Sequence, residues 1–312
     1  MFTCTFIRIS DVRTDHLSIR LFVAVVEESS ISRAAEREHI ALSAASRRIS
    51  ELEDTLGAKL LYRTTGGVYP TPAGQAVLRR ARNILREMQE METEVSTYGD
   101  GHRGLVRIAA NISSLMQFLP ERVATFKARF PFVEVNIKET TSAEAVKAVH
   151  DGQVDVALAS SSTGAEGLAK FSCWDDELVL VVPAGHTLAE SEGVTCLQAL
   201  EYEFVTLQYG GSIESQIRKF AQEAGKSLIA AVTVSSFDPM ARMVSAGVGV
   251  GVMPKGVAIQ LQQILNFTYV PLLESWSSRQ LQMFSKPSDE LTATASLFVA
   301  LLKERGLAND GC

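Results

Sequence analysis

Apolar side chains recur at helical spacing in short stretches near the start of the chain. Over 17–28 they return every three or four residues, which predicts an amphipathic helix. The inward positions of this helix are Leu17, Leu21, Phe22, Val25 and Val26. A shorter helix is expected over 33–38, and either Ser30 or Ser32 could cap it with a hydroxyl group.

A third helix is expected over 43–56, after a tight break at 39–42 and before Gly57, which suits the residue that ends a helix. Its expected inward positions are Ala45, Ile49, Leu52 and Leu56, and its outward positions are Ser43, Ala44, Ser46, Arg47 and Arg48. The order helix, short helix, turn, helix is that of a helix-turn-helix, whose last helix enters the DNA major groove.

A wing and a long helix are predicted next. Residues 60–69 read as two short extended pieces around the turn Gly66-Gly67. Thr71 and Pro72 are typical of an N-cap and the first residue of a helix, which should run to about Tyr98. A heptad seam follows this helix at Val77, Ala81, Ile84, Met88, Met91 and Val95. The seam packs either on its own domain or on a second copy, and its position after a DNA-binding module favours the second copy.

The spacing of apolar residues changes after 99–104, a segment whose glycines predict a hinge. Short apolar runs then alternate with amphipathic helices, which predicts parallel strands with helical crossovers. Strands are expected at 105–109, 133–137, 154–159, 178–182, 231–234 and 248–253, and helices at 113–129, 142–150, 213–224 and 239–246. The predicted fold class is therefore an all-α winged helix-turn-helix with a linker helix, followed by two α/β lobes.

Charge is unevenly distributed along the 312 residues, whose net charge is −6. Residues 1–86 hold 13 basic and 9 acidic side chains, a balance of +4, while the rest hold 17 basic and 27 acidic ones, a balance of −10. A basic N-terminal segment followed by an acidic remainder is typical of a protein that binds DNA through its N-terminal segment alone.

The composition also argues against several classes of protein. No apolar run is long enough to span a bilayer, and the first residues lack a signal-type apolar core, so a cytoplasmic protein without membrane contact is expected. The four cysteines are scattered without nearby histidines, so neither a disulfide framework nor a metal site is indicated. There is no phosphate loop, nucleophile elbow or H-E-x-x-H motif, which argues against an enzyme.

The segment 21–76 resembles the LysR-type transcriptional regulators. The matching motifs are "RAAE" at 33–36, "LE..LG..L..R" at 52–63 and "TPAG" at 71–74. The order of later motifs also fits, with "GQVDVALA" at 152–159 and "SAGVGVGVMP" at 245–254, so the resemblance covers nearly the whole chain from His16. It implies a winged helix-turn-helix and a two-lobed domain similar to periplasmic binding proteins, with an effector held between the lobes.

The resemblance implies a domain plan and partners. The plan is an extension over 1–14, a DNA-binding domain over 15–72, a linker helix over 72–98, a hinge over 99–104 and an effector-binding domain over 105–308, with lobe I at 105–175 and 280–308 and lobe II at 176–279. The implied partners are double-stranded DNA with an inverted repeat, further copies of the same chain and RNA polymerase. The copies would form a homodimer or a homotetramer through the linker helix. No cofactor is expected beyond a small-molecule co-inducer.

One departure from the family concerns the recognition helix. The family often has Ser-Gln-Pro-Ala at its start, where this chain has Ala41-Leu42-Ser43-Ala44. The glutamine amide that could read an adenine edge is therefore missing, and Ser43 is the expected N-cap. Arg47 and Arg48 either contact phosphate and guanine or form only a solvated face, and the helix-turn-helix context favours DNA. The expected DNA-binding residues are Ser32, Arg33, Ser43, Ala44, Ser46, Arg47, Arg48, Arg63, Thr64 and Thr65.

The expected effector site lies at the carboxyl ends of the strands, where helix N-termini attract anions. Its predicted residues are Asn111, Ser113, Ser114, Thr141, Ser142, Gln208, Tyr209, Ser212 and Phe237. Taken one by one, the hydroxyl groups could simply cap their helices. Their convergence on one cleft favours a ligand, expected to be an organic anion.

Three other functions are weighed against this prediction. The α/β lobes alone would fit a cytoplasmic enzyme or a solute-binding module. The missing catalytic motifs argue against the enzyme, and the missing signal peptide and the N-terminal DNA-binding motifs argue against the solute-binding module. A redox switch built on Cys173 and Cys196 is the third alternative. The two cysteines are 23 residues apart and no basic neighbour would activate either thiol, so effector binding is favoured.

Overall fold

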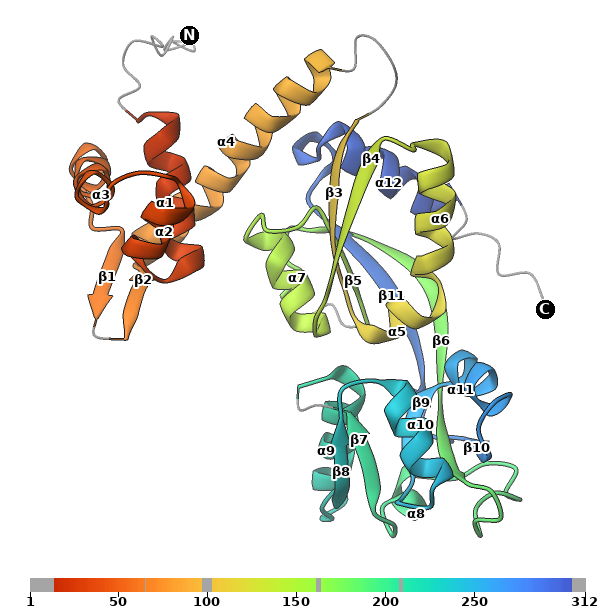
Figure 1. Ribbon diagram of the computed structural model, residues 1–312. Coiled ribbons are helices and arrows are strands. Elements are labelled where there is room, and N and C mark those ends of the chain that lie inside the picture. The colour runs from red at the N-terminus through yellow and green to blue at the C-terminus, as the bar shows by residue number, and fades with distance from the viewer. Residues whose placement is uncertain (1–13, 65, 97–102, 161–163, 208–209, 305–312) are drawn as a thin grey trace, which may run out of the picture. The chain divides into compact units, whose positions relative to one another are not determined.

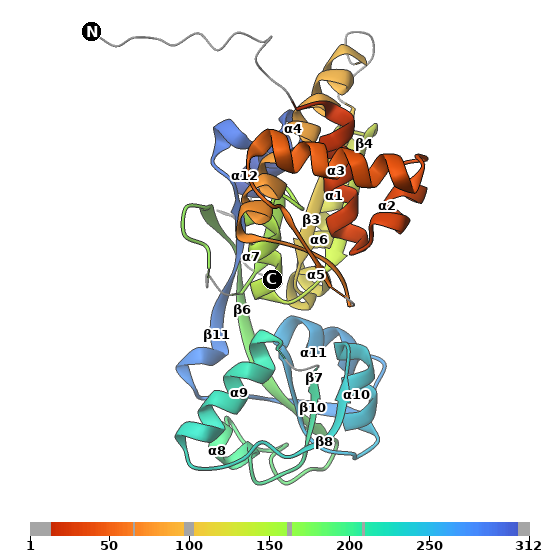
Figure 2. The same cartoon turned by 90° about the vertical axis from the view of Figure 1, so that its left-hand side faces the viewer.

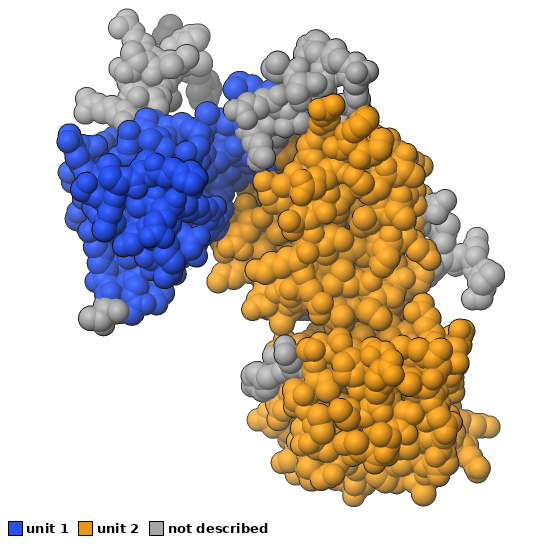
Figure 3. Space-filling model, viewed as in Figure 1, with its two compact units in different colours: residues 1–99 blue, residues 100–312 orange. Residues whose placement is uncertain are grey.

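The computed structural model describes residues 14–64, 66–96, 103–160, 164–207 and 210–304, and side chains within the linker helix are described up to 88 and at 91. The chain divides into two compact units, Met1–Gly99 and Asp100–Cys312 (Figures 1 and 3). The expected extension over 1–14 falls almost wholly outside the described residues, as do most of the predicted hinge and the end of the linker helix.

The first unit is a winged helix-turn-helix with a long helix attached (Figure 1). Its core is built by residues that are wholly buried, among them Phe22, Ala34, Ala45 and Ile49. The small alanines let the helices approach closely. The elements are α1 (His16–Glu28), α2 (Ile31–Arg37), α3 (Leu42–Leu56), β1 (Leu61–Thr64), β2 (Gly67–Pro70) and α4 (Pro72–Ser96).

The helices of this unit decide one open point of the prediction and correct two others. Ser30 caps α2, which begins at Ile31, so Ser32 lies inside the helix. Helix α3 begins at Leu42, and Ala41 stands at the N-cap without a side-chain hydrogen bond, so the prediction of Ser43 as N-cap was wrong. Leu56 was expected inside but is 43% exposed, because the last turn of α3 extends beyond the core.

A buried carboxylate connects α3 to the wing. Glu53, only 4% exposed, accepts hydrogen bonds from the backbone N–H groups of Leu60 and Leu61 at 2.9 and 3.2 Å and from Lys59 Nζ at 2.7 Å. Burial acts to raise the pKa of Glu53, but these hydrogen bonds outweigh it and hold the pKa below its usual value. The carboxylate therefore fixes the chain where it enters β1.

The second unit has two lobes joined by two long strands, β6 (Ala169–Pro183) and β11 (Ser278–Ser285), which run between the lobes in both views (Figures 1 and 2). The sheet order is β10 (Phe267–Pro271), β6, β11, β5 (Val156–Ala159), β3 (Gly104–Ala110) and β4 (Val133–Glu139), with β9 (Gly251–Pro254) also paired to β6. Strand β3 pairs in parallel with β4 and β5, as the alternating pattern predicted, whereas β11 is antiparallel to both β5 and β6. The predicted fold class is confirmed.

Lobe I has the parallel strands at its centre. Its other elements are β3 (Gly104–Ala110), α5 (Ile112–Gln117), α6 (Leu119–Arg129), β4 (Val133–Glu139), α7 (Ser142–His150), β5 (Val156–Ala159) and α12 (Ala293–Glu304). The single helix expected over 113–129 is divided at Phe118, because Pro120 lies in the first turn of α6 and cannot continue the preceding helix.

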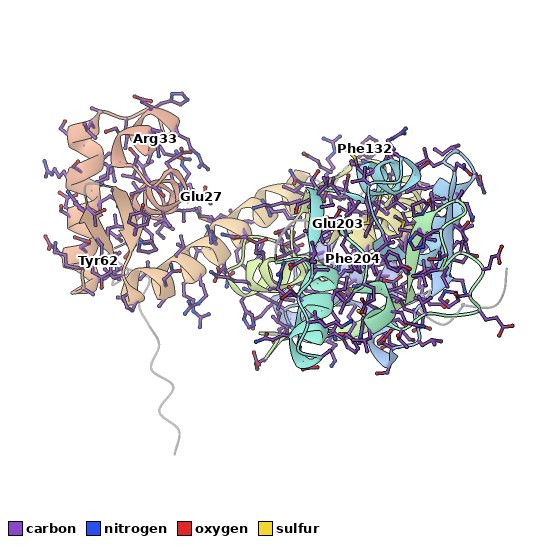
Figure 4. The ribbon with its side chains drawn as sticks, turned by 90° about the horizontal axis from the view of Figure 1, so that it is seen from below. Glu27, Arg33, Tyr62, Phe132, Glu203 and Phe204 are labelled. Atoms are coloured by element: carbon purple, nitrogen blue, oxygen red, sulfur yellow. The ribbon has the colours of Figure 1, made fainter. Side chains whose placement is uncertain are left out.

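Lobe II is organised around the other end of β6. Strands β7 (Phe204–Leu207) and β8 (Ala230–Val234) form a parallel pair, and a bridge from Phe204 to Val250 connects them to the main sheet. Phe204 begins β7 and Glu203 directly precedes it; both are labelled in Figure 4. The remaining elements are α8 (Cys196–Ala199), α9 (Ser212–Glu223), α10 (Phe237–Ser245), β9 (Gly251–Pro254), α11 (Lys255–Gln262) and β10 (Phe267–Pro271). Among the helices of the described ranges, none combines the length and apolarity needed to cross a bilayer.

Candidate DNA-binding and effector-binding sites

The outer face of α3 presents a cationic, hydroxyl-bearing surface. Ser43 and Ala44 are exposed, Ser46 is half-buried, and the Arg47 side chain is 81% exposed. Arg47 Nε donates to Glu51 one helical turn later at 2.7 Å, an exposed pair that constrains the side chain only weakly. Its guanidinium group is therefore available to a ligand outside the protein.

Arg48 has a different environment from Arg47. Its Nη1 donates to Asp15 Oδ1 at 3.2 Å and to Ser18 Oγ at 3.3 Å, and its side chain is 36% exposed. Asp15 is also the N-cap of α1, where it accepts the Ser18 N–H. Arg48 thus holds α3 against the start of α1 and is less available to DNA than the sequence suggested.

The other predicted DNA contacts belong to α2 and the wing. Arg33 is exposed at 61% and pairs with Glu28 at 3.6 Å, while Arg63 and Thr64 are exposed on β1. Ser32 is also exposed, and Thr65 lies outside the described residues. The sequence prediction missed the pair of Tyr62 and Tyr69, which stand directly opposite each other across the wing and are 56% and 48% exposed. Arg33 and Tyr62 are both marked on this unit in Figure 4.

The seam of α4 is divided between two environments. Its first turns pack on the core of the unit, where Val77 is half-buried and Ala81 is 3% exposed. Further along, Ile84 and Met91 are 45% and 58% exposed, and the side chain of Val95 lies outside the described residues. The second half of the seam thus leaves apolar side chains uncovered within one chain, the pattern of a helix that pairs with another.

Two adjoining cavities open between the lobes of the second unit. The larger, which we call the basic cavity, has a volume of about 510 Å³, and the smaller, which we call the acidic cavity, has about 330 Å³. Both walls include Ser142 from lobe I and Ser212 from lobe II. Both volumes lie in the range of small-molecule sites, about 300 to 1,000 Å³. The orange unit in Figure 3 narrows between its lobes.

A chain of side-chain hydrogen bonds crosses this cleft. Asn111 Nδ2 donates to Ser142 Oγ at 3.0 Å, and Ser142 Oγ lies 3.2 Å from Ser160 Oγ. Ser160 Oγ in turn donates to Ser212 Oγ at 2.9 Å. Since Ser212 belongs to lobe II and the other three to lobe I, the hydroxyl groups connect the lobes at the cavity wall.

Arg279, on the connecting strand β11, completes this network. Its Nη1 donates to Ser212 Oγ at 3.1 Å and its Nη2 to Ser113 Oγ at 2.8 Å. The guanidinium group also pairs with Asp176 at 2.7 Å, and Asp176 accepts from Gln117 at 2.9 Å. Burial lowers the pKa of Arg279, and Asp176 opposes that shift. The sequence prediction missed Arg279 and Asp176 because they lie in parts of two strands that the apolar pattern did not show.

The predicted effector residues divide into three groups. Asn111, Ser113, Thr141, Ser142 and Ser212 line the cavities. Ser114 is wholly buried behind them, and Phe237 is wholly buried in the core of lobe II, so its placement at the cleft was wrong. Gln208 and Tyr209 lie outside the described residues. Thr141 also caps α7 through a capping box with Glu144. This agrees with the alternative prediction that a single hydroxyl group of the set could serve only to cap its helix.

The two described cysteines are free thiols in protected places. Cys196 is 1% exposed in lobe II and Cys173 is half-buried on β6. Burial raises the pKa of the Cys173 thiol to about 11, and burial together with Glu274 raises the pKa of Cys196 to about 12. Both are therefore protonated at neutral pH. Among the described residues, no cluster of three or more metal-ligating side chains occurs.

Family models match both units of the chain. The model of the bacterial regulatory helix-turn-helix protein, lysR family, matches residues 17–75, and that of the LysR substrate binding domain matches residues 99–307. The chain belongs to the LysR family. It is a DNA-binding transcriptional regulator with an effector-binding domain, it is not an enzyme, and regulators of its family are oligomeric.

Relatives and solved structures agree with this assignment. The chain is 31% identical over 247 residues to the probable HTH-type transcriptional regulator LrrA of Synechococcus elongatus, covering 78% of this chain and 82% of the relative. It is 27% identical to a probable hydrogen peroxide-inducible genes activator of Streptomyces viridosporus, covering 78% of each. A full-length OxyR variant from Pseudomonas aeruginosa has a similar fold, with a TM-score of 0.71, 18% identity and 94% of each chain covered.

Proposed function

We propose that this regulator binds an inverted-repeat operator as a dimer or tetramer joined through α4. The observation that carries the proposal is the exposed Arg47 on the outer face of α3, the second helix of the helix-turn-helix motif, which enters the major groove in this class of domain. The uncovered half of the α4 seam supports pairing of two such helices. A protein of this kind works in the cytoplasm, where the promoter and RNA polymerase are its partners.

A titration of fluorescent DNA from upstream of its own gene tests DNA binding at controlled salt. Arg47→Ala/Arg48→Ala is expected to weaken binding at least tenfold and to reduce the salt slope by about one for each phosphate that the variant no longer neutralises. The control Arg129→Ala/Lys303→Ala removes two exposed cations from the second unit and should leave affinity unchanged. Equal affinity of both variants on every sequence selected from the genome would contradict the proposed interface.

The effector is proposed to be a small organic anion held in the cleft. The basic cavity is lined by Arg279, Lys219 and hydroxyl groups, among them that of Ser212, the first residue of α9. Gly211, which stands at the N-cap of α9 without a side-chain cap, lines the adjoining acidic cavity. A ligand that contacts both Ser142 and Ser212 binds one arrangement of the lobes better than another. It therefore shifts their equilibrium and the placement of the DNA-binding units.

A redox switch is the second candidate function, since one curated relative is named as a hydrogen peroxide-inducible activator. The described thiols do not favour it here. Oxidation by peroxide requires a thiolate, and the pKa values of about 11 and 12 keep both thiols protonated at neutral pH. The geometry of the cleft supports the effector proposal better.

A further inference from the structure

The charged side chains that line the two cavities have opposite signs. The charged residues that line the basic cavity are the cations Lys219 and Arg279. Those that line the acidic cavity are the carboxylates Glu139 and Glu144. The cavities are not separate pockets, because Ser142 and Ser212 belong to both walls. One molecule can therefore extend from a basic environment to an acidic one within a short distance.

The basic cavity also offers hydrogen-bond donors. Trp276 lines it, and the buried Nε1–H of this indole has no partner among the described residues. An unpaired buried donor is costly, so an acceptor on a ligand would be stabilised there. The hydroxyl groups of Ser215 and Ser278 and the amide of Gln216 line the same cavity. This set suits a carboxylate, which only accepts hydrogen bonds.

The acidic cavity offers the complementary chemistry. Glu144 is held in place by Thr140 Oγ1 at 2.5 Å and by the Thr141 N–H at 3.2 Å, and these contacts lower its pKa. It is therefore ionised at neutral pH. Glu139 ends β4 at the same cavity, and no ion pair to it is found among the described residues. Two carboxylates beside hydroxyl oxygens favour a ligand group with several N–H donors and a positive charge, such as an ammonium group.

We propose that the effector is a zwitterion, an amino acid whose carboxylate occupies the basic cavity and whose ammonium group occupies the acidic cavity. The inference rests on the proposed effector function and narrows its ligand class from organic anions to amino acids. Specificity comes from both ends. An acid without an amine brings no cation to the two glutamates, and an amine without a carboxylate leaves the Trp276 indole N–H without an acceptor.

Thermal unfolding of the full chain with three matched sets of compounds tests the proposal. The sets are the common α-amino acids with the ω-amino acids of two to six carbons, the corresponding hydroxy acids, and the corresponding amines. At least one amino acid should raise Tm in a concentration-dependent manner, while its hydroxy acid and its amine at equal concentration should not. Tight binding to the folded state raises stability by mass action, which makes this a direct readout.

Two variants then test which cavity binds the carboxylate and which binds the ammonium group of the amino acid. Glu139→Gln and Lys219→Gln should each weaken binding of that amino acid at least tenfold by calorimetry, and Glu134→Gln, on β4 but outside both cavities, should not. Equal stabilisation by the hydroxy acid would overturn the zwitterion and leave an organic anion as the effector. A panel in which no amino acid binds would overturn the amino-acid assignment, and the DNA titration would still decide the DNA-binding part of the proposed function independently.

Discussion

Arg279 and Asp176 face each other across the two strands that join the lobes, and their side chains form an ion pair at 2.7 Å. The Asp176 side chain is fully buried and that of Arg279 is 12% exposed. The pair stands where lobe I, lobe II and the cavity wall meet, because Arg279 also contacts Ser113 and Ser212. It therefore stabilises the second unit and shapes the effector site at once.

Removal of one partner of this pair should destabilise the second unit strongly. Asp176→Asn leaves a buried guanidinium group without its counter-charge, for which a cost of roughly 3–5 kcal/mol is typical. Urea unfolding followed by the fluorescence of Trp174 and Trp276 measures this. The control is Asp238→Asn, which removes an exposed helix pair with Arg242 and should change stability little. Equal stability of Asp176→Asn and the parent would mean that the pair contributes nothing.

The Glu53 carboxylate should make the stability of the first unit depend on pH. The folded-state pKa of Glu53 is below its ordinary value of 4.5, so its contribution is complete above pH 4.5 and is lost as the pH falls through the folded pKa. Glu53→Gln should therefore lower Tm at pH 7, and the difference from the parent should shrink on acidification below 4.5.

The matched control for this variant is Glu51→Gln on the exposed face of the same helix, whose side chain is 56% exposed. It should leave the pH profile of Tm unchanged. A Glu53→Gln difference that stays constant from pH 7 to well below 4.5 would contradict the ionised carboxylate as the cause.

Gly74 should accept no larger side chain. A Cβ atom at this position would lie 2.0 Å from the carbonyl oxygen of Leu60, which is backbone and cannot move aside without shifting β1. Thr71 Oγ1 fixes the same junction by accepting the Gly74 N–H at 2.9 Å. Gly74→Ala is expected to destabilise the first unit by roughly 1–3 kcal/mol and to weaken DNA binding. The control is Gly66→Ala, whose Cβ would have no neighbour closer than 3.8 Å. This variant should retain the stability of the first unit and its affinity for DNA.

Elements with a strong local pattern were predictable from the sequence. The periodic helices α1, α3 and α7 and the parallel strands β3, β4 and β5 lie within a few residues of their predicted ranges. Local apolar spacing determines such elements, and capping residues fix their ends. The motif glycine at 74 also has its structural reason in the close approach of Leu60.

The connection between the lobes was not predictable in the same way. Only residues 178–182 of the 15-residue strand β6 form a continuous apolar run, and β11 begins with three polar residues and has no apolar run longer than Met283-Phe284. Asp176 and Arg279 meet only through strand pairing at a separation of 103 residues. A charged residue in each of two strands carries no local signal of the other, so the central pair of the cleft needed the structure.

The α4 seam predicts the effect of a charge on self-association. Ile84 is 45% exposed and on the seam, so Ile84→Asp should weaken the dimer by placing an unpaired charge between two apolar helices. Analytical ultracentrifugation should show the dimer dissociating at a concentration at least tenfold higher than in the parent. Arg79→Asp, exposed on the opposite side of the helix, is the control. Unchanged association of Ile84→Asp would exclude this part of α4 from the interface.

Cysteine reactivity provides a last test, which separates the effector mechanism from a redox switch. With a pKa of about 11, Cys173 holds roughly a thousandth of its population as thiolate at pH 8, about a hundredfold less than a thiol with the ordinary pKa of 9.0. Iodoacetamide should therefore modify Cys173 and Cys196 at least a hundredfold more slowly than a free thiol, in a chain whose other two cysteines are replaced by Ser. Unfolding in urea should remove the protection, which shows that burial causes it. Fast modification of the folded chain, together with a change in DNA affinity on peroxide treatment, would instead favour regulation by a thiol switch over regulation by an effector in the cleft.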